Sequence, residues 1–114
     1  MTKKNYTECS SDLLPVRDAL DVISGKWKLL ILISISSGNH RFTKIERSIP
    51  KITSKVLSKE LKDLEENQLI KRTVYDETPV VIDYSITKYA KTLQPVIKAL
   101  SGWGSNHRKK IMKK

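Results

Sequence analysis

The sequence predicts a single, mainly helical domain that carries one small β-hairpin, an α+β fold. Apolar residues recur at helical spacing before residue 68 and again after residue 86. Between these regions, two runs rich in β-branched and aromatic residues flank a short polar turn, which is typical of a hairpin. The length of 114 residues matches one domain, and a single cysteine excludes a disulfide framework within the chain.

The first half of the domain is expected to contain three helices. Pro15 begins the first and Gly25 ends it, because proline favours the first turn of a helix and glycine its end. Residues 26–35 are apolar on nearly every side and should form the most buried helix. After a turn at 36–40, apolar side chains at helical spacing predict a short third helix over 41–49.

A fourth helix, at about 53–67, has two chemically different faces. Thr53 is its predicted N-cap, because a threonine hydroxyl accepts a hydrogen bond from a backbone N–H of the first turn. At about 100° per residue, three leucines share one narrow face and three lysines lie roughly opposite: Leu57, Leu61 and Leu64 against Lys55, Lys59 and Lys62. The leucine face suits a core, and the lysine face either keeps the helix soluble or meets a polyanion.

A hairpin and a last helical region complete the predicted domain. Ile70–Tyr75 and Val80–Ile86 are the expected strands of the hairpin. Residues from about 87 to 108 return to helical spacing, and Pro95 indicates that the helix restarts there. We therefore expect a domain at 15–105 that includes most of this C-terminal helix.

The two ends of the chain are expected to lie outside the domain, as a flexible segment at 1–14 and a basic tail at 109–114. No apolar run follows the first lysines, so no signal peptide is evident. The longest apolar stretch, around 27–35, is too short for a membrane span. These features predict a cytoplasmic protein without membrane contact.

Positive charge is in excess and unevenly distributed. The chain carries 22 lysines and arginines against 12 acidic residues, a net charge of +10. Seven basic and three acidic residues lie within 41–63. Such a surplus attracts polyanions, including nucleic acid and anionic lipid. Polyanion binding is favoured for this middle block, whose charge follows one helix face, whereas solubility alone is a serious alternative for the tail.

The order of elements, short helices followed by a basic helix and a hairpin, predicts a winged helix-turn-helix that binds DNA. A helix enters the major groove, where its N-terminal residues meet base edges, and the preceding helix braces the backbone. Serines and lysines suit base edges and phosphates, and flanking arginines suit phosphates. The predicted DNA-binding residues are Arg41, Thr53, Ser54, Lys55, Ser58, Lys59, Lys62 and Arg72.

Four stretches carry a family resemblance: PVRDALDVISGKWKLLIL (15–32), RFTKIERSIPKITSKVLSKELKDLEENQLIKRTVY (41–75), YSIT (84–87) and LQPVIKALSGWGSNH (93–107). Together with their spacing, which extends over about nine-tenths of the chain, they resemble the HxlR-type family of winged-helix regulators from bacteria and archaea. The resemblance implies a transcriptional regulator that is nucleoid-associated when bound to promoter DNA.

The resemblance also implies a homodimer that binds near-palindromic operators, with recognition helices in major grooves about 34 Å apart. The implied interface joins the N-terminal and C-terminal helices. An apolar stripe on the C-terminal helix supports it independently, because so much apolar area is rarely left in water; packing within one subunit is the alternative. The predicted interface residues are Val16, Leu20, Leu93, Val96, Ile97, Leu100 and Trp103.

In this family the hairpin, here at about 70–86, is the wing. Departures from the family pattern concern the wing and the cysteine. Val80 and Val81 stand where relatives usually continue with a proline and a lysine, which puts a wing-to-phosphate contact from that lysine in doubt. Some members sense oxidants or electrophiles through a cysteine directly before the proline of the first helix. Cys9 lies six residues ahead of Pro15, so it is either a redox sensor or an incidental surface thiol.

The sequence predicts neither a metal site nor a catalytic site. His40 and His107 have no cysteine or histidine at ligand spacing, and no nucleophile elbow or glycine-rich phosphate loop is found. We therefore expect no enzyme activity and no cofactor. The alternative function is a winged-helix module for protein–protein interaction, which the basic block at 41–63 disfavours. The sequence does not indicate which effector, small molecule or oxidant, acts on the protein.

Overall fold

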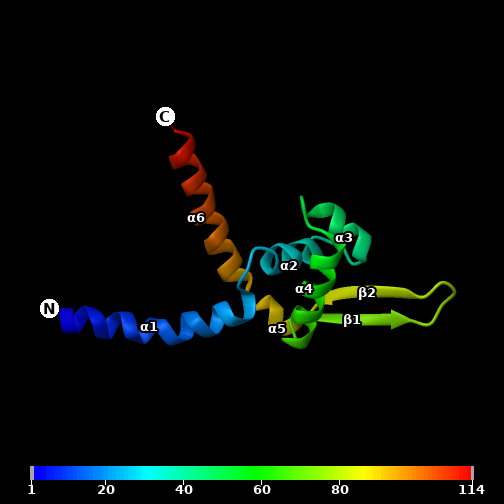
Figure 1. Ribbon diagram of the computed structural model, residues 1–114, viewed down its shortest axis with the longest axis horizontal. Coiled ribbons are helices and arrows are strands. Elements are labelled where there is room, and N and C mark those ends of the chain that lie inside the picture. The colour runs from blue at the N-terminus through cyan, green and yellow to red at the C-terminus, as the bar shows by residue number, and fades with distance from the viewer. Residues whose placement is uncertain (1, 114) are drawn as a thin grey trace.

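A computed structural model describes residues 2–113 of the chain, with side chains described for residues 11–113. The elements are α1 (Thr2–Ile23), α2 (Lys28–Ser36), α3 (Phe42–Ser48), α4 (Ser54–Glu66), β1 (Ile70–Tyr75), β2 (Val81–Ile86), α5 (Lys88–Lys91) and α6 (Gln94–Met112). The strands pair antiparallel. The predicted fold, mainly helical with a small hairpin, is confirmed. Figure 1 shows α2, α3, α4 and the hairpin as a body from which α1 and α6 extend as two arms.

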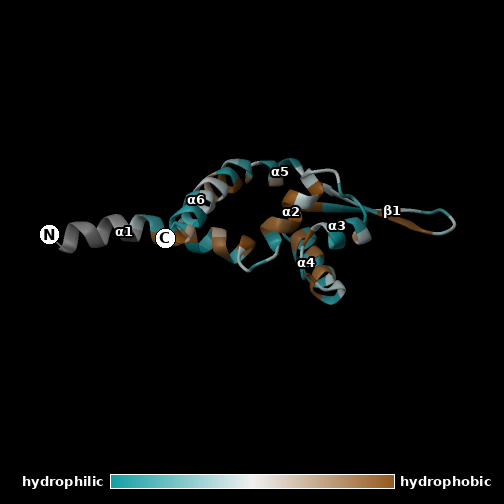
Figure 2. Ribbon diagram, turned by 90° about the horizontal axis from the view of Figure 1, so that it is seen from above, coloured by the Kyte–Doolittle hydropathy of each residue, from teal (hydrophilic) through white to brown (hydrophobic). Residues whose placement is uncertain are grey.

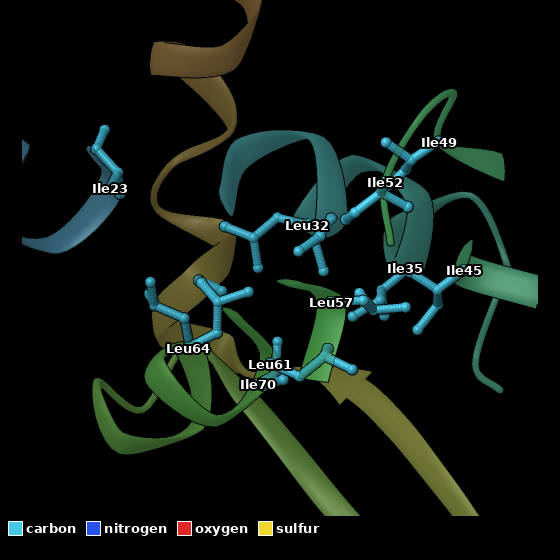
Figure 3. Packing of buried hydrophobic residues seen from close by; sticks show 13 residues of the cluster. Ile23, Leu32, Ile35, Ile45, Ile49, Ile52, Leu57, Leu61, Leu64 and Ile70 are labelled. Atoms are coloured by element: carbon cyan, nitrogen blue, oxygen red, sulfur yellow. The ribbon is translucent and has the colours of Figure 1, made fainter. Parts of the chain in front are cut away.

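A core of leucines and isoleucines holds the body together (Figure 3). Leu57 of α4 lies beside Ile35 of α2 and Ile45 of α3, and these three side chains are at most 1 % exposed. α2 is the most buried of the helices whose side chains are described, as predicted, with four buried residues among its nine. Leu30 and Ile33 on its remaining side are exposed. The reason is that α3, α4 and β2 cover only part of its circumference.

The caps of α4 set the limits of this helix. Thr53 has an extended backbone, and its Oγ1 accepts a hydrogen bond from Val56 N at 3.2 Å, as predicted. At the other end Asn67 is the C-cap, and Gln68 takes the left-handed conformation with φ of 62°. α4 therefore ends where expected, next to the predicted limit at about residue 67.

The segment between α2 and α3 anchors the hairpin to the body. Tyr84 N donates to His40 O at 2.9 Å, and His40 Nδ1 lies 3.1 Å from Tyr84 O. Because a carbonyl oxygen only accepts, Nδ1 carries the proton in this contact. β1 pairs with the other edge of β2, with Arg72 opposite Tyr84. The hairpin is thus held along both edges of β2 at its base.

α1 differs from the expectation, because it begins at Thr2 and contains Pro15 in its interior. The predicted start at Pro15 is wrong. Residues 2–14 contain no glycine or proline that would break a helix. An interior proline removes one backbone hydrogen bond and crowds the preceding turn, which can kink a helix without ending it. The flexibility expected for residues 1–14 stays a prediction.

α6 extends through Met112, beyond the expected end at about residue 108, so the predicted basic tail is helical over most of its length. Lysine and arginine are good helix formers, and their charge interacts favourably with the C-terminal end of a helix. The break predicted from Pro95 is confirmed: α5 ends at Lys91, and Pro95 lies in the first turn of α6.

The two arms leave much apolar surface outside the core. Figure 2 shows hydrophobic segments along the described part of α1 and along α6. Every described α1 side chain from residue 11 to residue 21 is exposed, and α6 has no buried residue. No described helix is both long enough and apolar enough to cross a membrane.

Candidate DNA-binding surface

α4 turns a polar face outward because the core takes its apolar face. Leu57, Leu61 and Leu64 are at most 2 % exposed. Five of the predicted DNA-binding residues lie exposed on the remaining surface of the helix: Ser54, Lys55, Ser58, Lys59 and Lys62. The structure thus brings all five together on one helix. Ser54 and Lys55 lie in its first turn, Ser58 and Lys59 in the next, and Lys62 farther along.

Two of these side chains already have contacts within the protein. Ser54 Oγ donates to Glu46 Oε2 of α3 at 2.7 Å. Lys59 Nζ lies 3.7 Å from Asp63 Oδ2, one helical turn away. An exposed pair of this kind contributes only about 0.3–0.5 kcal/mol, so a phosphate can replace it at little cost. Within residues 11–113, the remaining side chains bind no other side chain: Lys55, Ser58 and Lys62.

Arg41 links α3 to the hairpin. It is the N-cap residue of α3, and its Nε donates to Asp83 Oδ1 of β2 at 2.5 Å. The guanidinium group is half-exposed, and its terminal N–H groups take no part in this bond. Arg41 therefore joins the helical body to the wing through its Nε–H group. The terminal N–H groups of the guanidinium remain available to an anion.

Arg72 lies on β1 beside the core but in solvent. Side chains alternate along a strand, so Arg72 shares a face with buried Ile70, one step farther out along the hairpin. Its partner across the sheet is Tyr84, which packs against the core. The guanidinium is thus held near the body rather than at the outer end of the wing.

The tip of the wing has a different chemistry. Val74, Tyr75 and Val80 are exposed there, and Asp76 and Glu77 form the turn between the strands. Neither apolar nor acidic groups attract phosphate. The wing therefore offers positive charge at its base, through Arg72, and none at its tip.

This arrangement of elements recurs in known proteins. A family model described as HxlR-like helix-turn-helix matches residues 22–112. The chain belongs to the HxlR-like helix-turn-helix family. A relative from Bacillus subtilis strain 168, the uncharacterized HTH-type transcriptional regulator YdeP, is 36% identical over 96% of this chain and 85% of its own length. The protein is accordingly a DNA-binding transcription regulator of the winged helix-turn-helix type.

Solved structures of redox-related regulators share the fold of this HxlR-type protein. The redox regulator HypR in its reduced form superposes with a TM-score of 0.79 at 34% identity, covering 88% of this chain and 99% of HypR. The reduced form of the transcriptional regulator YodB from B. subtilis gives a TM-score of 0.68 at 34% identity, covering 76% and 85% of the two chains.

Lys28 of this HxlR-type regulator pairs with two acidic side chains of α4, a role that was missed in the sequence. Its Nζ lies 2.6 Å from Glu60 Oε1 and 3.6 Å from Asp63 Oδ2, both on α4. The Lys28 and Glu60 side chains are only 13% and 14% exposed. A charged residue at the start of an otherwise apolar helix is the signal that could have indicated this role, because buried charge requires a partner.

The predicted interface residues of the HxlR-type fold divide into two groups. Leu93 is half-buried against the core, so packing within one subunit, the alternative considered for the stripe, holds for this residue. Ile97 is also half-buried. The others are exposed on the two arms: Val16, Leu20, Val96, Leu100 and Trp103. The Cys9 side chain lies outside the described side chains.

Removing the Lys28 charge is expected to lower the free energy of unfolding. In Lys28→Met the Glu60 carboxylate loses its partner in a largely buried position, which costs about 1–3 kcal/mol. The matched control Lys59→Met breaks an exposed pair and should cost less than about 0.5 kcal/mol. Urea denaturation at equal protein concentration measures both. Equal losses in the two variants would show that Lys28 does not hold α4.

Proposed function

We propose that this regulator binds near-palindromic promoter operators as a homodimer, with α4 in the major groove. The observation that carries the proposal is the two-faced α4: three leucines buried in the core, and serines and lysines exposed on the other side. A helix held this way presents its N-terminal residues to base edges. In a dimer the two α4 helices would occupy successive major grooves, about 34 Å apart.

The exposed residues take different roles in this proposal. Near the N-terminus of α4, hydroxyls and amines reach base edges: Ser54, Lys55, Ser58 and Lys59. Lys62, farther along the helix, and Arg72, at the base of the wing, hold phosphates. Arg41 contacts the backbone with the guanidinium edge that Asp83 leaves unused. Thr53 acts mainly as the cap that orients the first turn.

The homodimer is supported by the two arms. Val16 and Leu20 on α1, and Val96, Leu100 and Trp103 on α6, expose more apolar surface than a stable monomer usually leaves in water. Packing these helices against a second copy buries that surface and doubles the number of α4 helices on the DNA. The proposed role is regulatory rather than enzymatic. The protein acts in the cytoplasm of a bacterium or archaeon, where promoter DNA lies.

Replacing the α4 lysines should weaken operator binding without unfolding the domain. Selection of bound sequences from random DNA at physiological salt defines the operator first. Lys55→Ala/Lys59→Ala/Lys62→Ala is then expected to lower affinity by about 10- to 100-fold. The slope of log affinity against log salt should fall by about one unit for each phosphate that a lysine no longer neutralises.

The matched control carries the same change of charge at the C-terminal end of α6 and its C-cap residue: Lys109→Ala/Lys110→Ala/Lys113→Ala. Its operator affinity should stay within about threefold of wild type. Operator binding by the α4 variant at the wild-type level would refute the assignment of α4. A selection that enriches no DNA would favour the protein-interaction module.

Charges placed in the apolar stripe of α6 should separate the dimer. Leu100→Glu/Trp103→Glu puts two carboxylates into the proposed interface, at positions exposed in the single subunit, with Trp103 at 68%. Sedimentation velocity is expected to detect the monomer while circular dichroism retains the body. Ser105→Glu, an exposed change outside the stripe, should remain a dimer. A dimeric Leu100→Glu/Trp103→Glu variant would rule out this interface.

Cys9 is proposed as a redox-sensing residue, by analogy with HypR, the similar protein that is named a redox regulator. Diamide should then change operator affinity in the wild-type protein and leave Cys9→Ser unaffected, because the chain has no other cysteine. Gel-shift titration with and without diamide measures the effect. A wild-type response that persists in Cys9→Ser would exclude Cys9 and assign it the role of an incidental surface thiol.

A further inference from the structure

A groove of about 930 Å³ separates the DNA-binding body from the start of α6. The C-terminal end of α2 and the base of β2 form one wall, and α5 and the first turns of α6 form the other. A volume of this size lies within the range of small-molecule sites, about 300–1,000 Å³. The groove is thus large enough for a compact ligand that touches both the body and an arm.

The lining of the groove combines an apolar floor with a cationic rim. Leu32, Ile35 and Ala90 are buried at the floor, and Ile97 is half-buried beside them. The rim carries two ammonium groups, one imidazole, an amide and hydroxyls: Lys91, Lys98, His40, Gln94, Ser36 and Ser101. None of the described residues that line the groove is acidic. The groove is therefore complementary to a small anion with an apolar body.

The groove uses a different side of α6 from the proposed dimer interface. At about 100° per residue, Gln94, Lys98 and Ser101 lie about 160° around the helix from the stripe of Val96, Leu100 and Trp103. A second copy packed on that stripe therefore leaves the groove side of α6 uncovered. This separation argues for a ligand rather than a partner helix as the occupant.

We propose that the groove binds a small apolar carboxylate. The hydrocarbon part replaces water over Ile33, Ile86 and Ile97, the lining isoleucines that keep accessible surface. The carboxylate accepts hydrogen bonds from Lys91 or Lys98 Nζ. Serine hydroxyls and the Gln94 amide supply further donors at the rim. The neutral amide of the same acid should bind more weakly, because it carries no negative charge to pair with the lysines of the rim.

The position of the groove allows a bound ligand to change the affinity for DNA. His40, in its wall, is hydrogen-bonded to Tyr84 of the wing, and the next residue, Arg41, is paired with Asp83. A ligand held between this wall and α6 binds preferentially the arm orientation that fits it and shifts the population toward it. That orientation sets where the second α4 of a dimer lies. This consequence rests on the proposed function, whereas the binding itself does not.

The test is titration of the full-length, ¹⁵N-labelled protein without DNA, using benzoate and octanoate as probes and benzamide and octanamide as neutral controls. Carboxylates are expected to shift the backbone amide signals of Ser36, Ser85, Gln94 and Ser101, with at least about tenfold higher affinity than the amides. Lys91→Gln/Lys98→Gln should lose this preference. The control Lys109→Gln/Lys110→Gln has the same loss of charge outside the groove and should keep it.

Ser101→Phe, which fills the mouth of the groove from an exposed position, should abolish binding even where the lysines remain. The inference is overturned by any of three results: no shifts at about 10 mM probe, equal affinity for acid and amide, or shifts confined to the α6 stripe. Because DNA is absent, these results stand apart from the operator experiment. If a carboxylate binds the groove but operator affinity stays unchanged, the ligand site is confirmed and its proposed effect on DNA binding is refuted.

Discussion

The burial of three leucines on α4 is the constraint on which the DNA-binding surface depends. Leu57, Leu61 and Leu64 reach at most 2 % exposure, and each fully buried leucine contributes about 2 kcal/mol. Rotating α4 about its axis would expose them together, so the lysine face cannot turn inward. Lys28 adds a second restraint from the neighbouring helix, through Glu60. The direction of the basic face is therefore a consequence of apolar packing and not of the lysines themselves.

Polar contacts add to the apolar packing that attaches the wing to this body, where Ile70 is buried in the core and Tyr84 and Ile86 pack against it. His40 and Tyr84 exchange backbone and ring hydrogen bonds, and Arg41 is paired with Asp83. These contacts connect the turn before α3 with the base of the hairpin. The groove is lined by the same turn, so the end of α2, the base of the wing and the start of α6 meet within one small region of the molecule.

Local signals were enough to predict most elements of the body and the faces of α4. Thr53 is followed by a clear amphipathic run, and Pro95 restarts the last helix where expected. The arms were less predictable, since Pro15 resembles a helix start and the end of α6 lacks a breaker. Contacts distant in sequence, such as Lys28 with Glu60, depend on how helices pack, and one sequence read alone does not contain that information. For the same reason the groove, which separate segments of the chain assemble, left no motif.

The exposed α1 arm makes the folding of this helix depend on protein concentration in the proposed homodimer. A helix exposed on all sides from residue 11 to residue 21 gains little from burial, and isolated helices are marginal in water. In the proposed homodimer, ordering of this arm and association of two chains are one thermodynamic step, so the ordering entropy reduces the net association energy. DNA binding by the proposed dimer then depends steeply on the cellular concentration of the protein. Dilution dissociates the dimer, so the helical α1 arm and the simultaneous contact of two α4 helices with DNA are lost together.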